Sequence, residues 1–497
     1  MNTNWHRKLL GLVIGCAAAV CFCLDVARAG PWTEVGDAQL RSDIEILADA
    51  GVIDNVTMTW PIPWGGILYR LDQPEALDGQ PDYVQDAARR VRDRGMAETQ
   101  TDELRASLSV DGTNLPDVIR SFDALGRETG QGQVTGEYLW STTALHLSLG
   151  AQTANRIDKQ TFMPDGSYFA QRIGNAVVYA GYQDHWWGPG WISSMILSTN
   201  ARPVPQVGFT RLDATPFQSP WLSWMGPWQF DFFAGVLDGP RKDKNTIYDG
   251  WRWEFSPFRH FEIAFSLTNE ICGEHHPCQP IAEYFHFTNN SSNPAKDKDD
   301  FNIDIKYNGA FRQWAYQAYV QFMNQDGPNP VIHTRTSHLA GASIWFPVKG
   351  GIERLTVEYA SSLATEDLWW GSTPYGFSYN DYKYTDGYRY RDRTLGFSLD
   401  DDSTLLSLQA NFTDNHARSF TLTYHHATIS DPHDASGTNV VTTAPVTLNM
   451  LDGRISLPLH LGGNGIHLDL DGRVQDDQPR PDKGFAAAGE VALRVAF

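Results

Sequence analysis

Apolar and polar side chains alternate over segments of about ten residues, from about residue 130 to the end of the chain. In the final segment Glu490 and Arg494 fall on one face, and the other face holds Phe485, Ala487, Gly489, Val491, Leu493, Val495 and Phe497. Lipid-facing and lumen-facing side chains alternate in this way along the strands of a membrane barrel. The pattern predicts an all-β transmembrane β-barrel spanning residues 128–497.

The spacing of the segments predicts the number of strands. Counting back from Phe497 gives about eighteen antiparallel strands, the first of them near Gly132. Short connections with turn chemistry are expected at 349–351, 400–402 and 462–465. Long polar or aromatic connections are expected at 183–204, 270–298, 324–338, 361–389 and 475–484. Bacterial barrels keep short turns at the periplasmic rim, so the long connections should be external.

Residues 30–127 have a helical pattern instead. Asp37 can cap a helix that ends near Gly51. A second helix is predicted from Pro81 to Gly95, because proline favours the start of a helix and glycine its end. Since apolar residues are too few for an independent core, we expect a small helical bundle on the periplasmic side of the barrel. Two further segments could be strands or linkers, namely 103–111 and 117–123.

The first 29 residues have the pattern of a signal peptide. Arg7 and Lys8 precede an apolar run, and Ala27-Arg28-Ala29 is a small-x-small cleavage site. This leader contains three cations and one carboxylate, so the mature chain would carry a net charge of about −22, compared with −20 for the whole sequence. Such an acidic chain disfavours nucleic-acid partners, which bind through cations that neutralise phosphates.

Two cysteines, Cys272 and Cys278, remain after the leader. A disulfide between them is expected in an oxidising compartment. His275 and His276 lie between them, which raises the alternative of a zinc site. Adjacent histidines point apart on an extended chain, however, and no second ligand cluster accompanies them. We therefore predict a disulfide and no metal.

Catalytic and cofactor motifs are not found in the sequence. It has no nucleophile elbow, metalloprotease helix, phosphate loop or dinucleotide fingerprint. Carboxylates are plentiful, but no glycosidase-like pair stands out among them. We predict no catalytic residue, no cofactor and no enzymatic activity.

A tryptophan-rich segment, residues 181–191, contains three tryptophans, three glycines and one proline. Indole faces suit the apolar faces of sugar rings, and nearby polar groups can bind hydroxyls or a uronate. The alternative is a structural role, as an interfacial girdle or a self-packed plug. A second aromatic run, 369–390, should fold over the opening from outside. The candidate polysaccharide-binding residues are Asp184, His185, Trp186, Trp187, Trp191, Asn200, Arg202, Trp369 and Trp370.

Several motifs together resemble the capsule assembly Wzi family, namely Gly36-Asp-x-x-Leu-Arg41, Thr59-Trp60-Pro61, Trp186-Trp187-Gly188-Pro189-Gly190-Trp191 and Asn200-Ala201-Arg202-Pro203. The resemblance spans most of the mature chain. It implies an outer-membrane barrel of about eighteen strands, a periplasmic helical bundle and a lumen occluded by loops. It also implies a lectin-like role that holds polysaccharide at the cell surface without catalysis.

We therefore expect a non-catalytic outer-membrane protein that binds capsular or exported polysaccharide and helps attach or assemble it. The expected partners are this polysaccharide, outer-membrane lipid and other polysaccharide-export components. The alternative function is a passive porin or an export channel for polysaccharide or sugar. An acidic polymer would need a bridging cation or a basic rim, for which the candidates are Arg202, Arg389, Arg391 and Arg393.

Overall fold

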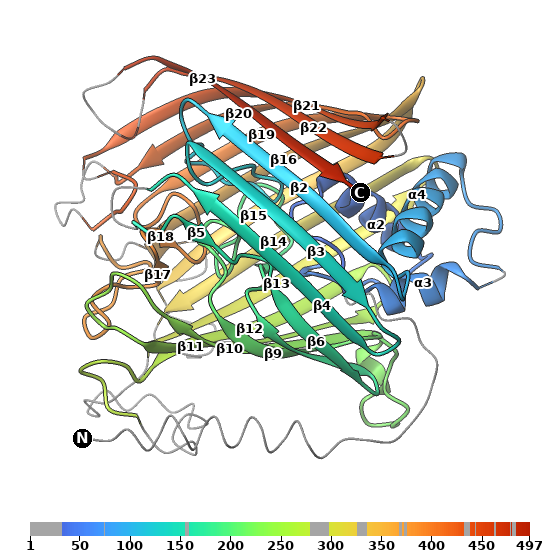
Figure 1. Ribbon diagram of the computed structural model, residues 1–497, viewed down its shortest axis with the longest axis horizontal. Helices are drawn as coiled ribbons and strands as arrows, with labels where there is room; N and C mark the ends of the chain where they lie inside the picture. Colours follow the sequence, from blue (N-terminus) through green and yellow to red (C-terminus); the bar gives the residue numbers. More distant parts are fainter. Residues whose placement is uncertain are drawn as a thin grey trace.

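The computed structural model describes residues 32–497, apart from residues 74, 155–158, 279–297, 326–334, 367–369, 372–374, 432–437, 443, 462–463, 478 and 480–483. The expected signal peptide, residues 1–29, therefore lies outside the described residues. Figure 1 shows a barrel of inclined strands with a group of helices at one end. We call this end the helical end and the opposite end the loop end.

Eighteen antiparallel strands form the closed wall within the described part of the chain. In chain order they are β2 (Leu104–Thr113), β3 (Gly130–Leu139), β4 (Thr143–Gln152), β6 (Tyr168–Ile173), β7 (Ala176–Gly181), β9 (Gln206–Arg211), β10 (Trp228–Leu237), β11 (Thr246–Phe258), β12 (Phe261–Ile271), β13 (Lys298–Phe311), β14 (Trp314–Gln325), β15 (Thr336–Val348), β16 (Gly351–Thr365), β19 (Thr404–Asp414), β20 (Ser419–Ile429), β21 (Val446–Leu461), β22 (Asn464–Gln475) and β23 (Ala486–Ala496). A short strand, β5 (Phe162–Met163), also pairs with β4.

The predicted barrel and its strand number are confirmed, but the predicted start near Gly132 is late by one strand. The wall begins with β2, which pairs with β23 on one side and with β3 on the other and so closes the ring. The alternation in β2 is real, because Leu108 and Val110 are exposed on the outside. The segment 117–123, by contrast, forms no strand.

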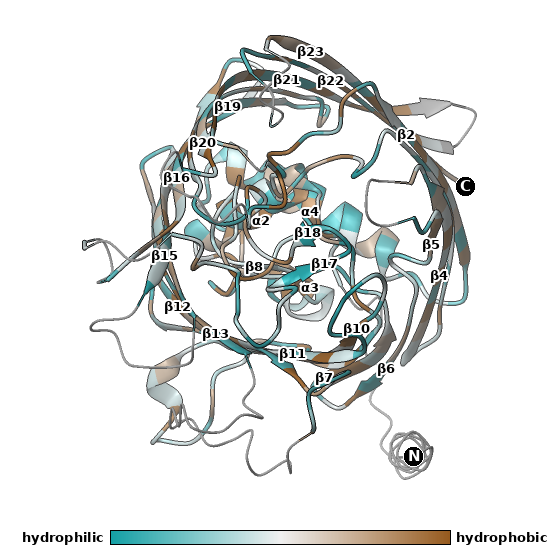
Figure 2. Ribbon diagram, turned by 90° about the vertical axis from the view of Figure 1, so that its left-hand side faces the viewer, coloured by the Kyte–Doolittle hydropathy of each residue, from teal (hydrophilic) through white to brown (hydrophobic). Residues whose placement is uncertain are grey.

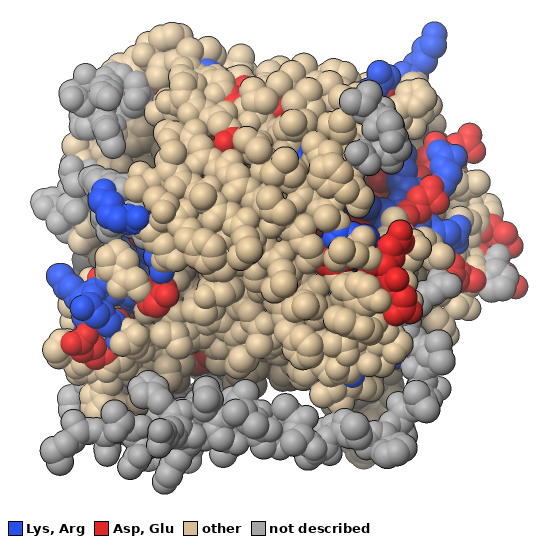
Figure 3. All heavy atoms as spheres, in the orientation of Figure 1, with Lys and Arg blue, Asp and Glu red and all other residues tan. Residues whose placement is uncertain are grey.

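The wall is apolar on the outside and polar on the inside, and β16 shows the pattern clearly. Leu355 and Val357 are each 43% exposed on the outer face, whereas Arg354 and Glu358 are buried inside. In Figure 3 charged side chains gather at the two ends of the barrel and few appear on the wall between them. Such a wall is stable in lipid, because the closed ring satisfies its backbone hydrogen bonds internally. None of the described helices is long and apolar enough to span a membrane.

Among the described residues, three α-helices lie at the helical end: α2 (Ala38–Asp49), α3 (Trp64–Leu71) and α4 (Asp82–Glu98). The predicted cap of α2 is present, because the Asp37 carboxylate accepts a hydrogen bond from the Leu40 amide at 2.9 Å. The predicted end of the second helix is wrong, since α4 continues through Gly95 to Glu98.

Gly95 serves as a point of close contact between helices, and this explains the error. A Cβ atom at Gly95 would lie 2.8 Å from the Leu68 side chain and 2.9 Å from that of Trp64. These two residues belong to α3. The sequence pattern does not predict this helix, because two prolines come directly before it. The glycine therefore marks where α3 crosses α4 closely.

Two of the three predicted tight turns join consecutive wall strands, at 349–351 and at 462–465. The prediction for 400–402 is wrong. Asp400, Asp401 and Asp402 are at most 2% exposed and belong to the long connection between β16 and β19. Turn chemistry is present there, since Asp400 and Asp402 have positive φ angles, but it serves a loop that folds back inside the barrel.

Replacing Asp37 with alanine should weaken the first turn of α2 by about 1 kcal/mol, because the Leu40 amide loses its acceptor. Hydrogen exchange at residues 38–41 should become faster, while the thermal unfolding of the barrel should stay unchanged. Asp37→Asn retains an oxygen acceptor and is the control. Equal exchange rates in Asp37→Ala and the parent protein would contradict this account of the cap.

Candidate functional site

The tryptophan-rich connection between β7 and β9 runs into the lumen and forms the centre of a plug. Its short strand β8 (Trp186–Trp187) pairs with β1 (Thr59–Trp60), which precedes α3. Trp186 and Trp187 are fully buried, and Trp191 is 2% exposed. Two segments that are far apart in sequence thus meet inside the barrel and fill it.

Glu358 on the inner face of β16 holds the turn of this connection. Its carboxylate accepts hydrogen bonds from the amides of Trp191 at 2.7 Å and Ser193 at 2.6 Å, and the Ile192 amide points to it at 3.2 Å. The Tyr319 hydroxyl donates to the same carboxylate at 2.9 Å. One wall carboxylate therefore satisfies three consecutive backbone groups that have no access to water.

Arg41 connects helix α2 to the plug from the helical end. Its guanidinium donates to the carbonyl oxygens of Pro189 at 2.8 Å and Gly190 at 2.9 Å. It also lies 4.3 Å from the ring centroid of Trp191, and the guanidinium of Arg354 lies 3.5 Å from that centroid. The indole is thus held by two cations and cannot offer its faces to a sugar.

Asp184 and His185 lie at the start of this connection. The side chain of Asp184 is 32% exposed and accepts a hydrogen bond from Arg127 at 3.1 Å. His185 is 5% exposed and stacks on Phe233 with ring centroids 5.0 Å apart. Burial lowers the pKa of His185 to about 3, so its imidazole is neutral at physiological pH.

Asn200 and Arg202 fix the return of the connection to the wall. The Asn200 side-chain amide donates to the Thr394 carbonyl at 2.9 Å. Arg202 forms a buried ion pair with Asp165 at 2.7 Å. The other arginines predicted for a basic rim are paired in the same way: Arg389 with Asp400, Arg391 with Asp238 and Arg393 with Glu128. Each candidate for a basic rim therefore has a carboxylate partner.

A second connection, residues 375–403 between β16 and β19, folds onto the plug from the loop end. The hydroxyl of Tyr379 donates to the Met195 carbonyl at 2.7 Å, and that of Tyr388 donates to the Ile196 carbonyl at 2.8 Å. Figure 2, viewed from the loop end, shows irregular segments crossing the interior of the ring. Residues 375–390 of the aromatic run thus lie against the plug at the loop end.

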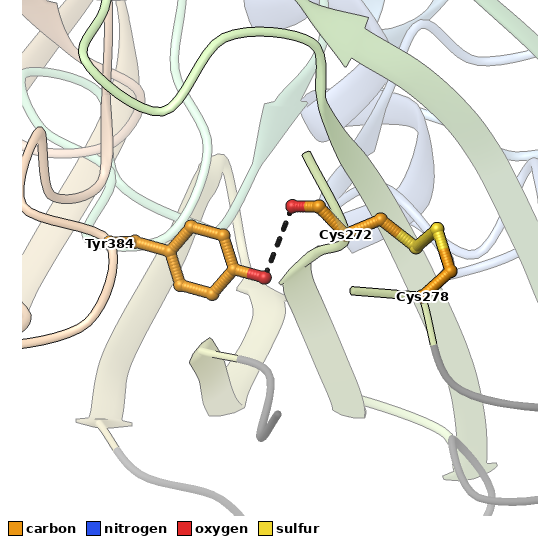
Figure 4. The surroundings of a disulfide bond; sticks show 3 residues. All are labelled: Cys272, Cys278 and Tyr384. Atoms are coloured by element: carbon orange, nitrogen blue, oxygen red, sulfur yellow. Dashed lines mark hydrogen bonds between the residues drawn. A yellow bond between two sulfur atoms is a disulfide. The ribbon is translucent and has the colours of Figure 1, made fainter. Parts of the chain in front are cut away.

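The structure joins Cys272 to Cys278 by a disulfide at the end of β12. Figure 4 shows the Tyr384 hydroxyl donating to the Cys272 carbonyl, at 3.2 Å. The disulfide loop therefore contacts the 375–403 connection. Within the described part of the chain, no three His, Cys, Asp or Glu side chains are grouped to hold a metal ion.

Carboxylates fasten the outer loops to one another. Asp386 accepts hydrogen bonds from the amides of Lys242 and Asp243, both at 2.9 Å, and Asp243 accepts one from the Thr385 amide at 2.9 Å. The connection between β10 and β11 is therefore locked to the 375–403 connection, and the side chains of Lys242 and Lys244 remain exposed.

Exposed aromatic side chains remain above this locked surface. Tyr382 is 77% exposed, Trp370 is 72% exposed and Tyr375 is 43% exposed. Trp369 lies outside the described residues. Of the candidate residues, only Trp370 and Asp184 present substantial side-chain surface, and the described others are buried. Tyr382 lies within the predicted aromatic run, but nothing in its spacing separates it from its buried neighbours.

The model of the capsule assembly protein Wzi family matches residues 100–476. The chain belongs to this family. An uncharacterized 55.8 kDa protein from the cps region of Klebsiella pneumoniae is 25% identical over 340 residues. That match covers 64% of this chain and 61% of the length of that relative. The membership and the apolar wall together place the chain in the outer membrane.

Among solved structures, the chain is similar to Wzi of Escherichia coli, with a TM-score of 0.79 and 19% sequence identity. The similarity covers 93% of this chain and 98% of that one. The Escherichia coli protein is described as an outer-membrane protein involved in group 1 capsule assembly and as a carbohydrate-binding β-barrel. At this identity the likeness establishes the shared fold.

Glu358→Ala should loosen the plug, because three buried amides lose their acceptor at a cost on the order of 3 kcal/mol. We expect faster hydrogen exchange at residues 191–193 and larger conductance in planar bilayers. Glu358→Gln retains one acceptor oxygen and should show a smaller effect.

Glu353→Ala is the matched control, because Glu353 lies on the same strand but on the opposite face. In this variant, hydrogen exchange at residues 191–193 and conductance should both equal those of the parent protein. Unchanged exchange and conductance in Glu358→Ala would show that other contacts hold the plug.

Proposed function

We propose that this chain is a non-catalytic outer-membrane barrel that binds capsular or exported polysaccharide and helps attach or assemble it at the cell surface. The observation that carries the proposal is the combination of a filled lumen with exposed aromatic rings above it. A filled lumen favours holding a polymer over conducting it. Membership in the capsule assembly family and the carbohydrate binding described for the Escherichia coli protein support the same role.

The proposal includes an orientation in the membrane. The loop end would face outward, and the helical segment, residues 30–127 without β2, would lie on the periplasmic side. Short turns gather at the helical end and long connections at the other, as in bacterial barrels generally. Outer-membrane lipid would surround the apolar wall. Contacts of the periplasmic side with other polysaccharide-export components stay a prediction.

The proposed binding surface consists of Tyr382, Trp370 and Tyr375, with Asp184 and the lysines of the β10–β11 connection near the outer mouth. Aromatic faces stack on the C–H faces of sugar rings, and the polar groups would bind hydroxyls or anionic substituents. The candidates His185, Trp186, Trp187, Trp191, Asn200 and Arg202 would act from beneath, by holding the loops in place. Binding alone is proposed, with no chemical step on the glycan.

The alternative of a porin or an export channel makes a different electrical prediction. A passive pore should conduct steadily in a planar bilayer. The parent protein should be nearly silent, because the plug occupies the lumen and is held from the wall and from α2. Steady conductance of the parent protein would favour the channel function over the proposed one.

The double variant Tyr382→Ala, Trp370→Ala should bind the producer's own extracellular polysaccharide about tenfold more weakly, which corresponds to about 1.4 kcal/mol. The reason is the loss of two exposed ring faces. Titration calorimetry of the purified protein in detergent would measure the affinity.

Tyr69→Ala is the control, because Tyr69 is 55% exposed but lies on α3 at the opposite end. It should bind like the parent. Absence of binding by the parent protein would refute the proposed function. Equal affinity of the double variant and the parent protein would show that the binding surface lies elsewhere.

A further inference from the structure

The connection between β9 and β10, residues 212–227, differs from the other connections at the helical end. The other described strand pairs there are joined by at most four residues, as in the turn between β11 and β12. The longer connection has an unusual composition, because the stretch from Ala214 to Phe230 contains no Asp, Glu, Lys or Arg. A long connection that is uncharged from Ala214 onward requires a physical explanation.

This connection packs on the outer, lipid-facing side of the wall. Trp228 and Phe255 point outward, since the residue next to each along its own strand points into the lumen. Phe217 stacks on Trp228 with ring centroids 4.3 Å apart, and Trp224 lies edge-on to Phe255 at 6.0 Å. Phe255 is consequently only 6% exposed, although it occupies a lipid-facing position.

Gly226 allows the close approach that this packing needs. Its φ angle is 65°, and a Cβ atom there would lie 2.1 Å from the Ser256 carbonyl oxygen of β11. The Ser256 amide donates to the Pro227 carbonyl at 2.9 Å. The connection is thus fastened to the edge of β11 by backbone contacts, and its position on the wall is fixed.

The other face of the connection is apolar and open. Trp221 is 86% exposed, Trp224 is 61% exposed and Leu222 is 40% exposed, around the short helix η1 (Ser223–Met225). Phe258 at the end of β11 is 71% exposed at the same end of the wall. In Figure 1 this segment is the green turn at the lower right, beyond the ends of the strands.

We propose that residues 215–226 lie in the headgroup region of the periplasmic leaflet and bind phospholipid through Trp221, Leu222 and Trp224. The segment is continuous with the apolar wall and lacks charge, and tryptophan favours the membrane interface. The connection that carries this segment starts at the helical end beside α3, because a Cβ atom at Gly65 would lie 3.2 Å from the Leu212 side chain. The inference goes beyond polysaccharide binding, and its assignment to the periplasmic leaflet rests on the orientation given with the proposed function.

Spin labelling of the full barrel in phosphatidylethanolamine and phosphatidylglycerol vesicles tests this proposal. A nitroxide on Trp221→Cys should collide with a water-soluble nickel chelate several-fold less often than a nitroxide on Trp370→Cys, and more often with oxygen. Ser223→Cys leaves both tryptophans in place and should give the same result. Among the described residues the native cysteines are joined as a disulfide and do not react.

Val357→Cys on the outer face of β16 is the hydrocarbon reference. A shielded label at Val357 together with water-like accessibility at both Trp221 and Ser223 would overturn the proposal and leave the membrane barrel intact. This result would be expected if the segment bound a periplasmic protein instead. Water-like accessibility at Val357 as well would refute the membrane position itself. Polysaccharide binding is measured separately and is unaffected by either outcome.

Discussion

A ring of eighteen strands encloses more space than its own inward side chains can fill, and every backbone group placed in that space needs a hydrogen-bond partner. The rest of the structure follows from this constraint. Among the described residues, the parts of the chain that enter the lumen include the segment around β1, the connection between β2 and β3 at Phe122, the tryptophan-rich connection and the 375–403 connection. Each is tied to the others or to polar side chains of the wall, and Glu358 alone accepts three consecutive amides.

The filled lumen also determines where a ligand can bind. Because the Trp191 indole packs against two guanidinium groups inside the plug, it is part of the scaffold. The ring faces that remain accessible at the loop end include those of Tyr375 and Tyr382 in the 375–403 connection, which the plug supports from below, and that of Trp370 just before it. A barrel of this kind presents a fixed outer surface. Its filled interior holds that surface rigid and leaves no open path for a polymer.

The wall and the two longer helices could be predicted from sequence, because they depend on local patterns: alternation in the strands and a cap at Asp37. The start of the barrel could be predicted only as a strand or a linker at 103–111, since β2 is recognised mainly by its pairing with β23. Gly95 and Asp401 show why other predictions failed. Each is a residue type that often ends a helix or forms a turn, but in each case a tertiary contact determines where the residue lies. The candidate tryptophans stand out in the sequence, but their burial depends on wall residues more than a hundred positions away, which the local pattern does not show.

The pairing of β2 with β23 has a consequence for biogenesis. The two strands that meet at the seam are the first and the last of the wall, so the cylinder cannot be sealed until the C-terminal strand has been delivered. Until then the interior stays open along its whole length, and the inward-folding connections can take their places from the side. The pairing of β2 with β23 therefore allows the lumen to be filled before the wall is closed.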